Sequence, residues 1–185
     1  MDWIDAKTIY TIVHVFGAIL GAGGAYVSDA MFFSSIKDRV ISGRELQFMK
    51  IGSTFVWVGL IIAIISGIFL FSTNPGVYSE SSKFLLKVVL VGVIFVNGIY
   101  FHKGHMPLMH RHKDEHYPSS DEFVRRKKLL IASGVISMTS WTFVVILGML
   151  RSIPIDLVTG LIGYVIFEII AILFARAFIK VGKVF

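Results

Sequence analysis

Histidine and methionine are concentrated in one stretch of the sequence, FHKGHMPLMHRHKDEH at residues 101–116. It holds five of the six histidines and two of the seven methionines: His102, His105, His110, His112, His116, Met106 and Met109. Imidazole and thioether groups are ligands of copper and zinc, and His112 and His116 would share one face of a helix. However, Pro107 interrupts the run, nearby lysine and arginine side chains would repel a cation, and no spacing typical of zinc sites is present. We interpret the stretch as a basic, solvated loop beside the lipid headgroups.

Five other ionisable side chains lie within apolar runs, where they are costly and mark functional sites by default: His14, Asp29, Lys87, Glu168 and Arg176. Each also has a structural interpretation. Lys87 could extend its amino group to the headgroups, Asp29 could lie at the membrane interface, and His14 could have a hydrogen-bonded packing role. Glu168 needs a partner or a proton, so it could form an ion pair, stay neutral or belong to a proton path. Its candidate partners are Arg176, His102 and Asn97.

The elements that position these side chains are membrane helices. The 185 residues are 55% hydrophobic and 16% charged, with a mean hydropathy of +0.77, whereas a soluble domain carries about 25% charged residues. Apolar runs of about 20 residues recur along the chain. We therefore predict an all-α integral membrane protein with a single transmembrane domain, a four-helix core plus one. The five spans are expected at residues 8–34, 51–72, 83–101, 129–150 and 155–179.

Charge and cysteine content narrow the function classes. Asp2 and Asp5 precede the first apolar run, whereas a cleaved signal peptide would begin with positive charge, so we keep the first helix in the mature protein. The absence of cysteine excludes disulfides, iron–sulfur ligation, thiolate zinc and c-type heme. The pI of about 9.6 reflects basic loops rather than nucleic-acid binding.

The distribution of basic residues predicts the orientation. Fourteen of the 18 lysines and arginines lie in the loops after the first and third spans or at the C-terminal end, and four lie on the opposite side. Because cytoplasmic loops are enriched in lysine and arginine, we expect the N-terminus outside and the C-terminus in the cytoplasm. His14 and Lys87 then lie at similar depths from the outer surface.

A run of small residues follows His14. The sequence GAILGAGGA at residues 17–25 gives the first helix a smooth face. Such a face lets another helix approach closely, and it also leaves room for a flat cofactor against the backbone. The sequence is compatible with both a helix-packing face and a cofactor slot.

Four segments resemble a superfamily of small membrane bundles that includes the copper-resistance-D type proteins and the heme-b-containing membrane protoporphyrinogen oxidases. They are KTIYTIVHVFGAILGAGG, IISGIFLF, KFLLKVVLVGVIFVN and GVISMTSWTFVVILGML, from the first four spans and about three quarters of the chain. By this resemblance Lys87 takes the lysine position of the third helix, and Trp141 follows a serine-rich turn in the fourth. The third-helix histidine of the oxidases has no clear match here.

The leading hypothesis is a small b-type heme protein of the membrane, acting in electron transfer or redox chemistry. His14 would be the axial ligand, and Lys87, with Arg151, would lie near the heme propionates. Met149 is the best available second ligand and Met138 lies deeper, although a five-coordinate iron is also possible. Trp141 completes the cofactor-binding set that the resemblance implies.

Three other functions stay open. The resemblance to the oxidases implies porphyrinogen oxidation at His14 and Lys87, and the resemblance to the copper-resistance proteins implies copper transport from His14 towards the histidine-rich stretch. A structural subunit of a larger membrane complex is the third. The expected partners are the lipid bilayer and a membrane redox partner or a second copy of the chain, and the expected location is a prokaryotic plasma membrane.

Overall fold

The computed structural model describes residues 5–38, 41–111 and 121–181, and within them every regular element is a helix. Five helical stretches are long and apolar enough to cross a membrane. The predicted fold class, an all-α bundle of five membrane-spanning helices, is therefore confirmed. The elements in chain order are α1 (Ala6–Asp38), α2 (Gly43–Thr73), α3 (Pro75–Ser79), α4 (Ser82–Tyr100), the π-helical turn η1 (Phe101–His105), α5 (Met106–Arg111), α6 (Asp121–Met149) and α7 (Leu157–Val181).

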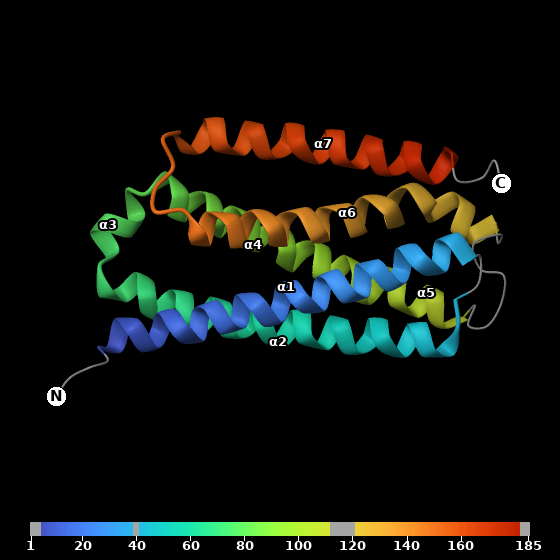
Figure 1. The fold of residues 1–185 in the computed structure, drawn as a ribbon, viewed down its shortest axis with the longest axis horizontal. Helices are drawn as coiled ribbons and strands as arrows, with labels where there is room; N and C mark the ends of the chain where they lie inside the picture. Colours follow the sequence, from blue (N-terminus) through green and yellow to red (C-terminus); the bar gives the residue numbers. More distant parts are fainter. Residues whose placement is uncertain (1–4, 39–40, 112–120, 182–185) are drawn as a thin grey trace.

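The long helices run side by side along one axis (Figure 1). We call the end where α1 begins and α6 ends the outer end, and the end where α1 ends and α2 begins the inner end. α1 begins at the outer end and α7 finishes at the inner end, as an odd number of spans requires.

Several helices extend beyond the apolar runs that identified them. α2 begins at Gly43, eight residues before the predicted start, because Ser42 and Glu45 form a capping box. The Ser42 backbone N–H donates to the Glu45 carboxylate at 2.8 Å, and the Glu45 N–H donates to the Ser42 hydroxyl at 3.2 Å. This exchange satisfies amides that a helix start leaves open. α6 likewise begins at Asp121, in a charged segment that hydropathy does not detect.

α1 and α2 form a closely packed hairpin. A Cβ atom at Gly24 would lie 2.6 Å from the Gly52 carbonyl oxygen, and one at Gly17 would lie 2.8 Å from the Ala63 nitrogen. Neither position has space for a larger side chain. On the same helix, Gly21 packs against the ring of Trp141 from α6. The run of small residues is thus a helix-packing face, and α2 and Trp141 fill the slot that a flat cofactor would need.

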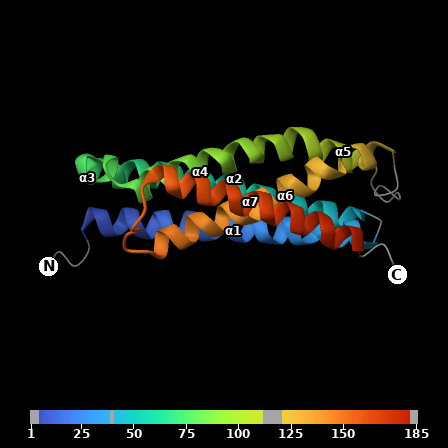
Figure 2. The same ribbon diagram turned by 90° about the horizontal axis from the view of Figure 1, so that it is seen from above.

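The remaining helices complete the bundle around this hairpin. α4 packs against α6, α6 also contacts α1, and α7 lies against α6 and α4 (Figures 1 and 2). α7 exposes a long series of large apolar side chains, including Ile162, Ile166, Ile170 and Phe174. This surface is the one that lipid covers around a membrane helix.

The histidine-rich stretch differs from the prediction. The third span does not end at residue 101 but continues through η1 and α5 to Arg111. Pro107 directly follows the π-helical turn η1 in this continuous helix, and such a turn changes the hydrogen-bond pattern where a proline supplies no backbone N–H. The loop interpretation is therefore wrong for residues 101–111. His112 and His116 lie outside the described residues.

Candidate functional site

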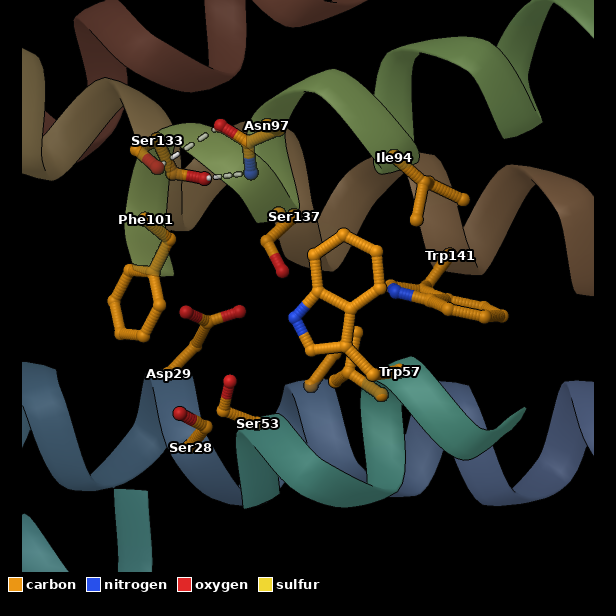
Figure 3. Close-up of a pocket in the computed structure, with 13 residues that line it drawn as sticks. Ser28, Asp29, Ser53, Trp57, Ile94, Asn97, Phe101, Ser133, Ser137 and Trp141 are labelled. Carbon is orange, nitrogen blue, oxygen red and sulfur yellow. Dashed lines mark hydrogen bonds between the residues drawn. The ribbon is translucent and has the colours of Figure 1, made fainter. Parts of the chain in front are cut away.

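A small cavity lies between the α1–α2 pair and the α4–α6 pair (Figure 3). Its volume is about 40 Å³. Six polar side chains line it: Ser28, Asp29, Ser53, Asn97, Ser133 and Ser137. The other walls include Trp57, Phe101 and Trp141. All four of the helices that form the core contribute to this site.

Asp29 is the charged side chain in the cavity wall. It is 4% exposed, and its Oδ2 atom has no hydrogen-bond partner among the described residues. α1 continues for nine residues beyond it, from 29 to 38, which places it about 13 Å inside the helix end at 1.5 Å per residue. The structure therefore buries Asp29 inside the bundle, where α2, α4 and α6 line the same cavity.

Trp141 and Asn97 form the side of the cavity that faces Asp29. Trp141 is 2% exposed, and its indole Nε1 has no partner among the described residues. The Asn97 amide donates to the Ser133 carbonyl oxygen at 3.0 Å and accepts from the Ser133 hydroxyl at 2.9 Å. This pairing holds α4 to α6 at the level of the cavity, and it means that Asn97 is not the partner of Glu168.

His14 lies towards the outer end and is fixed by α2. Its Nδ1 atom lies 2.8 Å from the Ala63 carbonyl oxygen and 3.2 Å from the Ser66 hydroxyl oxygen. A carbonyl oxygen only accepts, so Nδ1 carries the hydrogen. The Nε2 atom makes no hydrogen bond with the described residues and is not enclosed. The ring also lies beside Gly67, so His14 is on the face of α1 that meets α2.

Lys87 is half-buried near the start of α4, at the same end of the bundle as His14 (Figure 1). Met149 is 81% exposed at the end of α6, and the Arg151 side chain is exposed as well. A residue that sequence reasoning missed fixes this region: the Lys83 amino group donates to the Leu150 and Arg151 carbonyl oxygens at 2.7 and 3.1 Å.

Glu168 lies between α6 and α7 and has different partners from those expected. It is 7% exposed, and the Thr139 hydroxyl donates to its Oε1 atom. Beside it, the Tyr164 and Ser140 hydroxyls are 2.8 Å apart. Arg176 instead donates to the Lys128 carbonyl oxygen at 3.4 Å, and His102 is exposed. These hydroxyl contacts tie α7 to α6.

His105 is buried at the inner end of the bundle. It is 1% exposed, and neither ring nitrogen has a hydrogen-bond partner among the described residues. Its ring meets those of Tyr100 and Phe101 edge to face. The adjacent Met106 and Met109 are buried in an apolar cluster that also contains Met49. A solvated role for this histidine is excluded by its burial.

Sequence reasoning missed the serines and Asn97 as a group. The signal was available in part, because Ser133 and Ser137 are spaced by four and share one helix face. Three or more His, Asp or Glu side chains do not come together as a metal-binding group in the part of the chain that the structure describes. Searches of family models, curated proteins and solved structures find no match to this chain.

Proposed function

We propose that the chain is a membrane-embedded redox protein that carries a b-type heme at His14 and exchanges electrons with another membrane protein. The observation that supports this most is the state of the imidazole. The Ala63 carbonyl accepts from Nδ1, and this arrangement is typical of metal-ligating histidines because it fixes the ring and directs the lone pair of Nε2 outward. The hydrogen bonds of His14 with the described residues all involve Nδ1, so Nε2 makes none with them.

The surrounding residues fit this group in their chemistry. His14 would supply the axial nitrogen and Lys87 a positive charge for a propionate, and both lie at the outer end of the bundle. When bound, a heme supplies one-electron redox chemistry. The protein's own residues fix the ligand ring through Ala63 and Ser66.

The available space decides where such a group would lie. Pockets for ligands of drug size have volumes of about 300–1,000 Å³, so the cavity of about 40 Å³ at Asp29 is too small for a porphyrin. The run of small residues is occupied by α2 and Trp141. The proposal therefore has His14 and Lys87, at the outer end of the bundle, as the residues that would hold the heme.

A visible spectrum of the purified protein tests this proposal. A Soret band that shifts on dithionite reduction is expected, and His14→Ala should abolish it or weaken it strongly. Lys87→Ala should weaken it less, because a propionate can find other donors. His110→Ala is the matched control, since His110 is exposed at the other end of the bundle. A colourless wild-type protein, or a normal Soret band in His14→Ala, contradicts the proposal.

The buried His105 favours a second candidate, copper binding at the inner end. An unpartnered imidazole next to Met106 and Met109 offers the soft ligands that Cu(I) prefers. If the purified protein contains no heme and is colourless, its competition with a chromogenic Cu(I) chelator would test copper binding. His105→Ala should lower the affinity at least tenfold, and His102→Ala, which alters an exposed neighbour, should not. Equal affinities in the two variants would exclude this site.

A further inference from the structure

Asp29 is a carboxylate at membrane depth without a positive partner in the cavity wall. The residues that α2, α4 and α6 present to the cavity carry hydroxyl, amide, indole and apolar groups, and none of them is titratable. An ionised carboxylate in such surroundings is strongly disfavoured unless a positive charge accompanies it. Since Oδ2 is buried and has no partner among the described residues, the carboxyl group is either protonated and neutral or ionised with a positive charge that comes from outside the chain.

The groups around Asp29 are suited to a hard cation. Ser53 and Ser137 direct their hydroxyl groups towards the Asp29 carboxylate, and Ser28 lies beside them (Figure 3). Carboxylate and neutral oxygen atoms are the ligands that hard cations prefer. One carboxylate balances one positive charge, so the composition of the site favours a monovalent ion over a divalent one.

The size of the cavity and its aromatic walls further limit which ligands can bind. A volume of about 40 Å³ is sufficient for a bare ion or one or two water molecules but not for an organic solute. The rings of Trp57 and Trp141 line the cavity, and the indole nitrogen of Trp57 lies on the edge of its ring that is directed towards Asp29 (Figure 3). Trp57 also packs edge to face on Phe95 of α4, with ring centroids 5.6 Å apart, which fixes this wall.

We propose that this cavity binds one small monovalent cation, with the Asp29 carboxylate as its anionic ligand and the hydroxyl groups of Ser53 and Ser137 as neutral ligands. A sodium ion fits this chemistry, whereas a proton would be taken up by the carboxylate itself and would leave a neutral acid without a bound ion. Because Asp29 belongs to α1, Ser53 to α2 and Ser137 to α6, the bound ion joins the hairpin to the second helix pair. Binding is therefore expected to stabilise the bundle, since a ligand of the folded state raises the unfolding temperature.

Thermal unfolding of the detergent-solubilised protein tests the proposal. The Tm is measured while NaCl replaces N-methyl-D-glucamine chloride at constant ionic strength, at mildly acidic and mildly alkaline pH. A rise of about 3–5 °C is expected for each tenfold increase in Na⁺ above the dissociation constant. Equilibrium binding of radioactive Na⁺ should approach one ion per chain.

Two variants show whether Asp29 is responsible for Na⁺ binding and for the Na⁺-dependent rise in Tm. Asp29→Asn keeps the shape and removes the charge, so it should abolish both Na⁺ binding and the Na⁺-dependent rise in Tm. Glu168→Gln is the matched control, because Glu168 is also a buried carboxylate but lies between α6 and α7, and it should keep the full response. If Asp29→Asn does not fold, Ser137→Ala should fold and show an affinity at least several times weaker.

The two sources of positive charge give different results. If Asp29 takes up a proton in place of the ion, Na⁺ has no effect, and the Tm of the wild type falls as the pH rises while that of Asp29→Asn does not change with pH. That result overturns the cation site. If the Tm of the wild type depends on neither Na⁺ nor pH beyond what Asp29→Asn shows, the site binds no cation and the proposal is overturned. A Na⁺ response that survives in Asp29→Asn overturns it as well.

Discussion

At the scale of single residues, the pairing of Asn97 with Ser133 makes a measurable contribution to stability. Removing one partner of a buried hydrogen bond costs about 1–3 kcal/mol, because the other partner loses both its bond and its solvation. We expect Asn97→Ala and Ser133→Ala each to lower the free energy of unfolding by about that amount. The double variant should cost clearly less than the two single costs together, since Asn97→Ala removes both hydrogen bonds and Ser133→Ala removes the one that the Ser133 hydroxyl donates, which the two variants share. Unfolding in mixed micelles measures this, and strictly additive costs would contradict the pairing.

Asp156, which precedes α7, gives a prediction about pH. The Thr159 hydroxyl and backbone N–H donate to its carboxylate at 2.6 and 3.0 Å, and these bonds hold the pKa of Asp156 below its ordinary value of 3.8. A carboxylate with a lowered pKa contributes its stabilisation above the ordinary value and loses it as the pH falls through the lowered pKa. Amide hydrogen exchange at the first turn of α7 should therefore accelerate below about pH 4. Asp156→Ala should show fast exchange there at every pH. If the variant and the wild type exchange at the same rate, the hydrogen bonds from Thr159 to Asp156 do not stabilise the start of α7.

At the scale of helices, the glycines of α1 provide a matched pair of substitutions. Gly24 faces the Gly52 carbonyl oxygen of α2, whereas a Cβ atom at Gly23 would meet nothing within 4 Å. Gly24→Leu should force the hairpin apart and lower the free energy of unfolding by about 1–3 kcal/mol or more. Gly23→Leu, which adds the same atoms towards lipid, should be neutral or slightly stabilising because it replaces glycine in a helix.

The comparison of these two variants isolates helix packing from helix propensity. Both are made in the same helix, at adjacent positions, with the same residue type. Melting of the purified variants measures the difference. Equal unfolding temperatures would mean that α1 and α2 do not approach each other as closely as the structure shows.

At the scale of the whole molecule, the prediction concerns orientation across the membrane. Fourteen basic residues lie on the side of the C-terminus and four on the other, so the positive-inside rule places the C-terminus in the cytoplasm. A green fluorescent protein fused after Phe185 should fluoresce, and an alkaline phosphatase fused there should be inactive. High phosphatase activity at this position would reverse the outer and inner assignment, and His14 would then lie near the cytoplasm.

Hydropathy and composition, read from the sequence, determined the five membrane helices, the all-α class and the absence of cysteine chemistry. Apolar length is a property of each segment by itself, so it needs no knowledge of neighbours. The same reasoning placed the starts of α2 and α6 too late, because both helices begin with charged residues. It also ended the third helix at residue 101, because a charged, histidine-rich segment with a proline was interpreted as a loop.

Only the tertiary structure decided which polar residues meet. The sequence gives the depth and face of Asp29, Ser53, Asn97 and Ser137 on their own helices, but their distances depend on how those helices rotate and cross. That rotation is set by the close contact of Gly17 and Gly24 with α2 and by Trp141 on Gly21. These contacts bring the four polar residues around one cavity. In the same packing, Glu168 accepts a hydrogen bond from Thr139, and His14 donates one to the Ala63 carbonyl oxygen. The position of a residue along its helix determines its depth in the membrane, whereas the packing between helices determines which residues its side chain contacts.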